Sequence, residues 1–240
     1  LEIRNGGYDA IWLHGYNFAV SWIALFAAKS KGIPVFLRGE THLELKKTAL
    51  AKFLHKNFLK YVFRLIDGFL VIGTKNREYY ESLGVSRDKL YDVPYTVDND
   101  RFIKNSVLNI EETKFTKSKY NVSENIPVLL FASKFTKRKH PEQVLNAANI
   151  LQKKGYRFSV LMIGSGEMES ELRSLAKECR LENIVFGGFV NQSELPRIYG
   201  ISDVFLLPSE NEPWGLIVNE VMCSSKPIIV GNEVGCAHDL

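Results

Sequence analysis

The sequence predicts an α/β protein built from two doubly wound parallel sheets. Short apolar runs rich in Val, Ile, Leu and Phe alternate with amphipathic helical stretches along the chain, as expected for parallel sheets covered on both faces. The 240 residues are 45% hydrophobic and 24% charged, which suffices for one large domain or two small ones. A polar stretch without a strand separates two groups of strands, which favours two domains.

The expected elements follow from these runs in chain order. Strands are expected at residues 8–13, 34–38, 68–73, 89–94, 127–132, 158–163, 183–187, 203–207 and 227–231. Helices are expected at 17–31, roughly 42–66, 74–83, 140–154, 167–180, 192–200 and 214–225. Gly32, Gly84 and Gly155 stand where the helices before them should end.

The domain division follows from the polar Lys-, Thr- and Ser-rich stretch around residues 102–125. We expect an incomplete first Rossmann-like domain over residues 1–105, a linker over 106–125 and a second domain over 126–240. The first group has fewer strands than the second, and the chain lacks an initiator Met and stops where a new helix should begin. These features favour a fragment of a longer protein, cut at both ends.

Charge and hydropathy favour a cytoplasmic protein. The formal charge is +4, and no apolar run approaches the roughly 20 residues that span a bilayer. There is no signal-peptide start, and the three cysteines have no paired or metal-like spacing.

One segment carries a concentrated positive charge. The expected helix over 44–64 has one acid, Glu44, against six basic residues, Lys46, Lys47, Lys52, Lys56, Lys60 and Arg64. Such a helix can lie peripherally on the inner face of an anionic membrane, although a solvated helix face explains the pattern as well. Nucleic acid is not expected as a partner, because the aromatic residues lie on the apolar side and the net charge is low.

The segment SENEPWGLIVNEV places two carboxylates around the start of a helix. Glu212 precedes the Pro213-Trp214-Gly215 turn, and Glu220 follows inside the apolar helical run. Backbone N–H groups at the start of a helix lack intrahelical acceptors and bind anions. Two carboxylates for hydroxyl groups and amides for a diphosphate suit a nucleotide sugar. In isolation, chance or a solvated helix face would explain such a pair of glutamates at least as well.

Two further loops have residues that suit a diphosphate. Lys134 and Lys139 lie between a buried strand and a helix, where doubly wound sheets bind ligands, although a solvated basic loop has the same appearance. Gly164 and Gly166 open the next helix and would allow a close backbone approach to a phosphate or sugar. A bare Gly-x-Gly is also a common tight turn.

A fourth loop, VFGGFVNQSEL, has exposed backbone at Phe189 and Val190 that could hold a flat base. A plain turn between strand and helix is an equal alternative for this loop alone. Four consecutive loops with compatible groups at one sheet edge are harder to explain as coincidence.

The motifs in these loops together resemble a known family. Residues 127–235 resemble the donor-binding domain of retaining glycosyltransferases of family 4, the group 1 glycosyl transferases. The resemblance rests on SKFTKRKHPE, MIGSGE, FGGFV and LLPSENEPWGLIVNEVMCSSKPIIV, the last being a Glu-x7-Glu signature. FLVIGTKNREYYESLGV and KLYDVPYTVDNDRF resemble the end of the acceptor-side domain. The resemblance implies the GT-B fold, with two Rossmann-like domains facing a cleft.

The resemblance also implies roles for individual residues. Glu220 would accept hydrogen bonds from the ribose, and Glu212 would contact the transferred sugar. The amides of Trp214, Gly215 and Leu216 would meet the diphosphate, which Lys134 and Lys139 would neutralise. Gly164, Gly166, Phe189 and Val190 would complete the donor site. Members of the family are similar in needing neither a metal ion nor another cofactor, the nucleotide sugar being a co-substrate.

The chain departs from the family pattern at two positions. Lys134 replaces the usual Arg, which keeps the charge but loses the bidentate fork. The family often has a His after the strand at 34–38, whereas this chain reads LRGETH, so that Arg38, Glu40 or His42 would lie on the acceptor side. His14, at the end of the first strand, is a further acceptor-side candidate, although a lone His is more often structural.

The expected function is therefore a metal-independent hexosyl-type glycosyltransferase. It would act on a nucleotide sugar and a glycan or lipid-linked acceptor in polysaccharide or glycolipid synthesis. A GT-B sugar-nucleotide epimerase, a glycan phosphorylase and a non-catalytic nucleotide-sugar-binding module are the alternatives. A dehydrogenase is disfavoured, because no Gly-x-Gly-x-x-Gly follows any expected strand.

Overall fold

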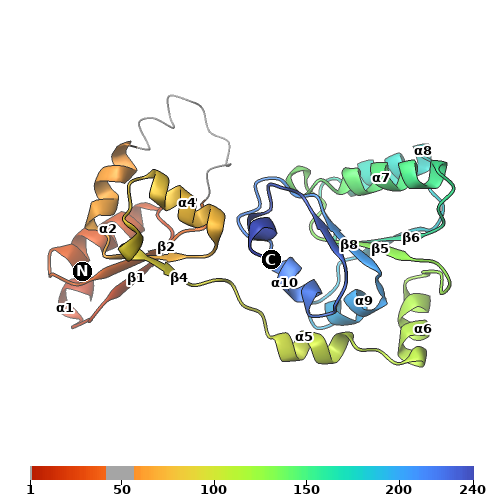
Figure 1. Ribbon diagram of the computed structural model, residues 1–240, viewed down its shortest axis with the longest axis horizontal. Coiled ribbons are helices and arrows are strands. Elements are labelled where there is room, and N and C mark those ends of the chain that lie inside the picture. The colour runs from red at the N-terminus through yellow and green to blue at the C-terminus, as the bar shows by residue number, and fades with distance from the viewer. Residues whose placement is uncertain (1, 42–56) are drawn as a thin grey trace. The chain divides into compact units, whose positions relative to one another are not determined.

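The computed structural model describes residues 2–41 and 57–240, which form two compact units (Figure 1). Unit 1 comprises Leu1–Tyr95 with His238–Leu240, and unit 2 comprises Thr96–Ala237. Each unit contains one parallel sheet with helices packed against it. The α/β class predicted from the alternating pattern is confirmed.

Unit 1 has four strands that follow chain order across the sheet. They are β1 (Ile11–His14), β2 (Val35–Arg38), β3 (Gly68–Val71) and β4 (Leu90–Asp92). Its helices are α1 (Glu2–Asn5), α2 (Ala19–Lys29), the helical residues 57–62 and α4 (Thr74–Ser82). Short 3₁₀ turns lie at Phe63–Leu65 and Arg87–Lys89.

The core of unit 1 is aromatic and is fixed by the strand pattern. Phe69 of β3 is fully buried, and its ring lies 5.2 Å from that of Phe63 and 4.7 Å from that of Tyr80. Gly32, which was predicted to end a helix, has a φ of +70° and allows Ile33 N to donate to Ala28 O at 3.1 Å. The chain therefore turns from α2 directly into β2.

Unit 2 has five parallel strands in the order β7-β6-β5-β8-β9. They are β5 (Val128–Ala132), β6 (Ser159–Ile163), β7 (Ile184–Gly188), β8 (Val204–Leu207) and β9 (Ile228–Val230). The chain builds outward from β5 to β7 and then returns to place β8 on the other side of β5. This reversal is a topological switch point, and ligands of open α/β sheets bind at the carboxyl ends of strands there.

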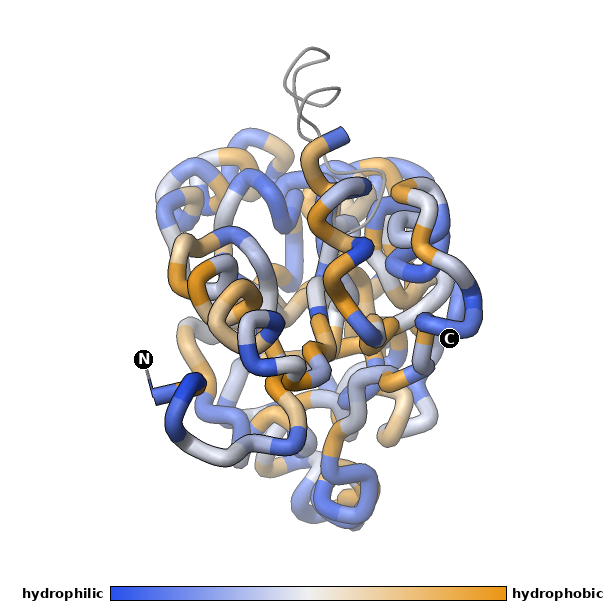
Figure 2. Tube along the Cα trace, turned by 90° about the vertical axis from the view of Figure 1, so that its left-hand side faces the viewer, coloured by the Kyte–Doolittle hydropathy of each residue, from blue (hydrophilic) through white to orange (hydrophobic). Residues whose placement is uncertain are grey.

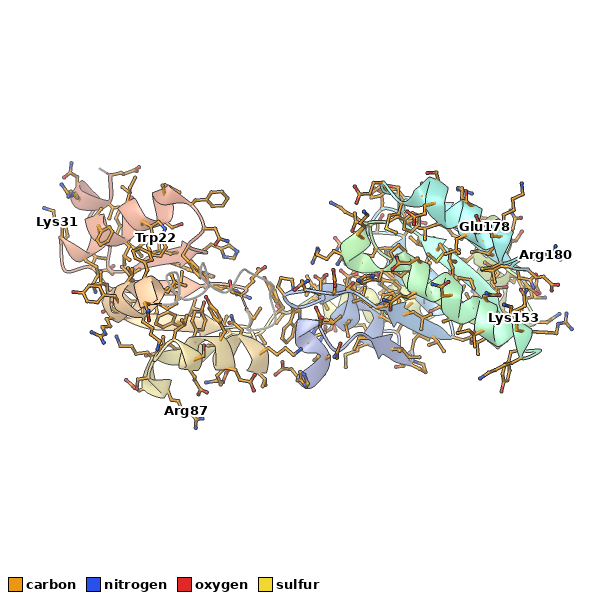
Figure 3. All side chains as sticks on the ribbon, turned by 90° about the horizontal axis from the view of Figure 1, so that it is seen from above. Trp22, Lys31, Arg87, Lys153, Glu178 and Arg180 are labelled. Carbon is orange, nitrogen blue, oxygen red and sulfur yellow. The ribbon has the colours of Figure 1, made fainter. Side chains whose placement is uncertain are left out.

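Helices cover both faces of the sheet in unit 2 (Figure 1). One face carries α7 (Pro141–Lys153) and α8 (Glu169–Glu178), and the other carries α9 (Leu195–Ile201), α10 (Leu216–Met222) and α5 (Asn99–Ser106). A further helix, α6 (Ile110–Lys119), and 3₁₀ turns at Lys137–Lys139 and Gly235–His238 complete the elements of this region. Charged side chains at the ends of α7 and α8, such as Lys153 and Arg180, point away from the unit (Figure 3).

The domain boundaries differ from those expected. Unit 2 begins at Thr96, and the stretch predicted as a linker contains α6. This polar helix is stabilised at its start by a capping box, in which Asn109 Oδ1 accepts from Glu112 N at 2.9 Å and Glu112 Oε2 accepts from Asn109 N at 3.0 Å. A polar sequence without apolar periodicity concealed this helix.

All nine predicted strands are present, and hydrophobic and hydrophilic segments alternate along the trace (Figure 2). Most of the basic helix predicted at 44–64 lies outside the described residues, so the predicted membrane contact stays a prediction. Within the part of the chain that the structure describes, no helix is both long and apolar enough to cross a bilayer.

Candidate functional site

The loops that follow β5 and β8 flank the switch point of unit 2 and are joined to each other. Glu210 N donates to Arg138 O at 2.9 Å, and Arg138 Nη1 donates to Asn211 O at 3.3 Å. Because β5 and β8 are neighbours in the sheet, residues far apart in sequence meet here. This pairing brings the predicted Lys139 to the predicted Glu212.

Glu212 is held by two cations. Its carboxylate Oε2 accepts a hydrogen bond from Lys139 Nζ and lies 3.2 Å from Arg138 Nη1. The Lys139 and Glu212 side chains are 14% and 13% exposed, whereas that of Arg138 is 47% exposed. The Lys139 pair is therefore poorly screened by water, and two positive groups and one negative group meet at this point. Arg138 was not among the predicted site residues, although its place in the KRK run was a usable signal.

The backbone around Glu212 is fixed by the loop after β9. Glu212 N donates to Glu233 O at 3.2 Å, and Gly235 N donates to Glu212 O at 2.8 Å. A Cβ on Gly235 would lie 1.9 Å from Pro213 O, so these two segments of the backbone approach more closely than any residue other than glycine would permit. The position of the Glu212 carboxylate is thus set by three loops.

The turn into α10 follows immediately. Gly215 has a φ of +90°, and Val218 N donates to its carbonyl at 2.8 Å to begin the helix. Trp214 is buried, and its Nε1 donates to Asn219 Oδ1 at 2.8 Å. Leu216 is partly exposed at the first position of α10. The predicted amides of Trp214, Gly215 and Leu216 are therefore adjacent in the turn that opens the helix.

Glu220 lies one turn further along α10 and is 7% exposed. Its Oε2 accepts from the Tyr199 hydroxyl at 2.8 Å, and its Oε1 accepts from Gln192 Nε2 at 3.2 Å. Burial, and then the charge of Glu220, raises the pKa of Tyr199 far above its ordinary value, which keeps the hydroxyl protonated as a donor. Neither Tyr199 nor Gln192 was predicted, because their pairing with Glu220 depends on how α9 and α10 pack.

The predicted Gly-x-Gly loop has a packing role. A Cβ on Gly164 would lie 1.9 Å from Ser133 O, and one on Gly166 would lie 2.4 Å from Phe135 O. Phe135 N donates to Ser165 O at 3.0 Å across the same contact. Both glycines therefore bring the loop after β6 against the backbone of the loop after β5. The predicted approach of a ligand to these glycines stays a prediction.

The remaining predicted donor residues lie on the surface of unit 2. Phe189 is 75% exposed and lines, with Val190, Tyr120 and Asn121, a cavity of about 510 Å³. Lys134 is exposed and forms no ion pair with any residue that the structure describes. Of the two predicted lysines, Lys139 thus meets Glu212, whereas Lys134 remains on the surface.

His140 lies beside the cation cluster, in the left-handed region with a φ of +48°. Its Nδ1 lies 2.8 Å from Glu142 Oε1, and its Nε2 lies 3.5 Å from Glu210 Oε2. Burial lowers the pKa of His140, but its hydrogen bonds to Glu142 and Glu210 outweigh this effect and raise the pKa above its ordinary value. His140 therefore provides a second link between the two loops.

In unit 1, the predicted acceptor-side residues lie at the carboxyl ends of β1 and β2. His14 is exposed and stands opposite Arg38 in the register. The Arg38 guanidinium lies 4.6 Å from the centre of the Tyr95 ring, and its buried Nε has no hydrogen-bond partner among the described residues. The Tyr95 hydroxyl donates to Glu40. His14, Arg38 and Glu40 thus share one sheet edge, whereas His42 lies outside the described residues.

The loop that carries Glu40 is held by neutral groups. Asn76 is 3% exposed, and its Nδ2 donates to Gly39 O at 2.9 Å and to Thr41 O at 2.7 Å. Its Oδ1 accepts from Ile72 N at 3.2 Å. The Tyr16 hydroxyl also donates to Thr41 Oγ1 at 3.1 Å. A buried amide on α4 therefore shapes the loop after β2.

Among the described residues, no group of three or more His, Cys, Asp or Glu side chains is arranged to hold a metal ion.

Two parallel sheets covered by helices, with a switch point in unit 2, place the chain in the class of Rossmann-like α/β proteins. The model of the family described as Glycosyl transferases group 1 matches residues 112–240. The chain belongs to this family, as the Glu-x7-Glu segment and its neighbouring loops indicated.

Curated relatives agree with this assignment. An uncharacterized glycosyltransferase of Methanocaldococcus jannaschii is 30% identical over 127 residues, which cover 52% of this chain and 32% of the relative. A GDP-mannose-dependent alpha-(1-6)-phosphatidylinositol monomannoside mannosyltransferase of Mycobacterium tuberculosis is 26% identical over 60% of this chain and 38% of its own length.

Solved structures share the fold. A glycosyltransferase from Rickettsia africae has a TM-score of 0.75 at 21% identity and covers 98% of this chain, which spans 61% of that protein. Anabaena HepE in complex with UDP has a TM-score of 0.77 at 13% identity and covers 99% of this chain, which spans 64% of HepE. The likeness shows the fold, GT-B. The chain spans less than two thirds of each of these four proteins.

Proposed function

We propose that this chain carries the donor site of a retaining glycosyltransferase that moves a hexose-type sugar from a nucleotide-diphosphate sugar to a hydroxyl acceptor. The main support is the contact between Lys139 and Glu212 at the switch point. The loop that carries Glu212 leads into α10, which carries the buried Glu220. The HepE complex with UDP and the GDP-mannose-dependent relative support a nucleotide sugar as the donor. The donor site belongs to unit 2, and unit 1 supplies the acceptor side in polysaccharide or glycolipid synthesis.

The proposed roles follow from the chemistry of the site. Glu220 accepts hydrogen bonds from the ribose, and Glu212 accepts them from hydroxyls of the transferred sugar. The amides at the start of α10 and the cations Lys134 and Lys139 meet the diphosphate. Negative charge grows on that diphosphate as it departs, so these groups stabilise the transition state without a metal ion. Lys139 is paired with Glu212 and is thus held close to the position where it would act.

The test is donor turnover by the protein that carries this chain. We expect release of nucleoside diphosphate from one member of a panel of UDP-, GDP- and ADP-sugars when a hydroxyl acceptor is present, and no effect of EDTA. Inactivity of the folded protein with every donor and acceptor would contradict the proposal. Conversion of a sugar nucleotide without acceptor would indicate an epimerase, a requirement for inorganic phosphate would indicate a phosphorylase, and binding without turnover would indicate a binding module.

Ligand binding tests the role of Glu220 directly. Glu220→Ala should weaken nucleoside diphosphate binding by about 1–3 kcal/mol, because a hydrogen-bonded carboxylate is lost. Isothermal titration calorimetry with UDP, GDP and ADP measures this change. The matched control is Glu178→Ala at the exposed end of α8, which should bind as the unchanged protein does. Equal affinity of Glu220→Ala and the unchanged protein would rule out the assignment.

A further inference from the structure

The buried carboxylate of Glu220 is held by neutral partners. Among the residues that the structure describes, no lysine or arginine forms an ion pair with it. Its two oxygens instead accept from the Tyr199 hydroxyl at 2.8 Å and from the Gln192 amide at 3.2 Å. A charged carboxylate that is buried needs hydrogen-bond donors. Neutral donors such as these orient the carboxylate without cancelling its charge.

Tyr199 is itself held rigidly. Its side chain is fully buried, and its ring stacks on that of Phe102 of α5 at 6.3 Å between centroids and 25° between planes. At the next position, a Cβ on Gly200 would lie 2.4 Å from Ser106 O, so α5 packs directly against the backbone of α9. The Tyr199 hydroxyl therefore points at Glu220 from a fixed position.

The hydrogen bonds leave part of the carboxylate available. An ionised carboxylate offers about four acceptor positions on its two oxygens, and Tyr199 and Gln192 use one on each. About two acceptor positions remain, which matches the two adjacent hydroxyls of a ribose. Gln192 is exposed in the loop after β7, whereas Tyr199 is buried, so one surface donor and one interior donor hold the two carboxylate oxygens.

We infer that Tyr199 is a positioning residue that orients the Glu220 carboxylate toward the ribose hydroxyls of the nucleotide, and that it thereby makes the site select ribonucleotides over deoxyribonucleotides. This inference rests on the proposed function, because it requires a nucleotide at Glu220. Tyr199 acts through Glu220 and does not itself contact the ligand. Its removal should therefore affect recognition of the ribose specifically.

The experiment compares Tyr199→Phe with the unchanged chain by calorimetry. The probe is whichever of UDP, GDP and ADP binds most tightly, together with its 2′-deoxy counterpart. Loss of one hydrogen bond should weaken binding of the ribonucleotide by about 3- to 10-fold, with less effect on the deoxynucleotide, so the ratio of the two affinities falls. Tyr156→Phe, at an exposed position of the same unit, is the matched control and should leave both affinities unchanged.

Three outcomes decide the inference. A Tyr199→Phe variant with unchanged ribonucleotide affinity, or with equal losses for both nucleotides, overturns it. In a Glu220→Gln background, Tyr199→Phe should have no further effect on the ribonucleotide preference, and a full additional loss there would show that Tyr199 does not act through Glu220. If the unchanged chain binds none of the three nucleotides, the proposed function fails and the inference fails with it.

A second variant keeps the test decisive if Tyr199→Phe does not fold. Gln192→Ala removes the exposed partner of the other carboxylate oxygen, where truncation is tolerated. It should lower the preference for the ribonucleotide by a smaller factor than Tyr199→Phe. An unchanged preference in Gln192→Ala would overturn the inference in that case.

Discussion

The two units build their candidate loops in different ways. In unit 2, β8 returns to the other side of β5, and the loops after these strands are joined by Lys139, Arg138 and Glu212. In unit 1, the described strands follow chain order, and the loop after β2 is held by the neutral side chain of Asn76. One unit thus fixes a candidate site with charges and the other with buried amide hydrogen bonds.

The difference indicates what each loop can respond to. A charged ligand competes directly for ion pairs, so the contact between Lys139 and Glu212 can be exchanged for contacts with a diphosphate and a sugar. The hydrogen bonds of Asn76 are buried between backbone carbonyls, and a ligand has no group that would replace them. We therefore expect the loops of unit 2 to rearrange with ionic conditions and ligand, and the loop of unit 1 to keep its shape.

The largest effect is expected from removing the side chain of Asn76 in unit 1. Asn76→Ala leaves Gly39 O, Thr41 O and Ile72 N buried without this partner, and it should lower the free energy of unfolding of unit 1 by about 2–3 kcal/mol. Hydrogen exchange of peptides from residues 57–95 measures the effect. Ser30→Ala, whose exposed hydroxyl donates to Ala27 O of α2 in the same unit, is the matched control and should change little. Equal losses in the two variants would contradict a special role for Asn76.

A smaller effect, and one sensitive to salt, is expected in unit 2. Glu212→Gln leaves Arg138 and Lys139 side by side without their carboxylate, and it should destabilise the paired loops by about 1–2 kcal/mol at low salt. The difference from the unchanged protein should shrink as salt screens the two cations. Hydrogen exchange of peptides from residues 133–140 at two salt concentrations tests this.

The matched control is an exposed ion pair of unit 1. In the pair between Arg87 and Glu81, the Arg87 side chain is 84% exposed, so Glu81→Gln should change stability by less than about 0.5 kcal/mol. An Asn76→Ala effect that varied with salt as strongly as the Glu212→Gln effect would remove the distinction between the two units.

The sequence predicted the strands because each is a short apolar run between helical segments. It also predicted that Lys139 and Glu212 lie at one sheet edge, since loops at the carboxyl ends of parallel strands meet there, and the two residues are in contact. The donor site that they would share with Glu220 stays a prediction. The sequence missed α6, where polar residues and a capping box form a helix without an apolar stripe, and α5, a short and mostly polar helix that buries Phe102. The hydrophobic pattern of the sequence therefore predicted helices and strands best where their apolar residues are buried.

The contacts within the site were not predictable in the same way. The pairing of Arg138 with Glu212 requires β5 and β8 to be neighbours, and strand order is not encoded in hydrophobic periodicity. The bond from Tyr199 to Glu220 depends on how α9 packs against α10. The glycines of the loop after β6 lie against the backbone of the loop after β5, and the sequence pattern did not indicate this contact. Each case depends on a neighbour that is distant in sequence.

The smallest expected effect concerns the imidazole that links the same two loops in unit 2. The folded pKa of His140 lies above its unfolded value, because Glu142 and Glu210 favour the charged form despite burial. Its contribution to stability is therefore fully present below the unfolded pKa of about 6.5 and is lost as the pH rises through the folded pKa. At a partly exposed site this contribution should be about 0.5 kcal/mol.

His140→Asn tests this contribution, since asparagine tolerates the left-handed backbone of this position. The free energy of unfolding in urea, measured at about pH 5.5 and about pH 8.5, should show a deficit for the variant at the lower pH that disappears at the higher pH. A deficit that is equal at both pH values would show that His140 stabilises the loops by packing alone. The ion pairs that join the two loops of unit 2 would then be those of Glu212 with Arg138 and Lys139.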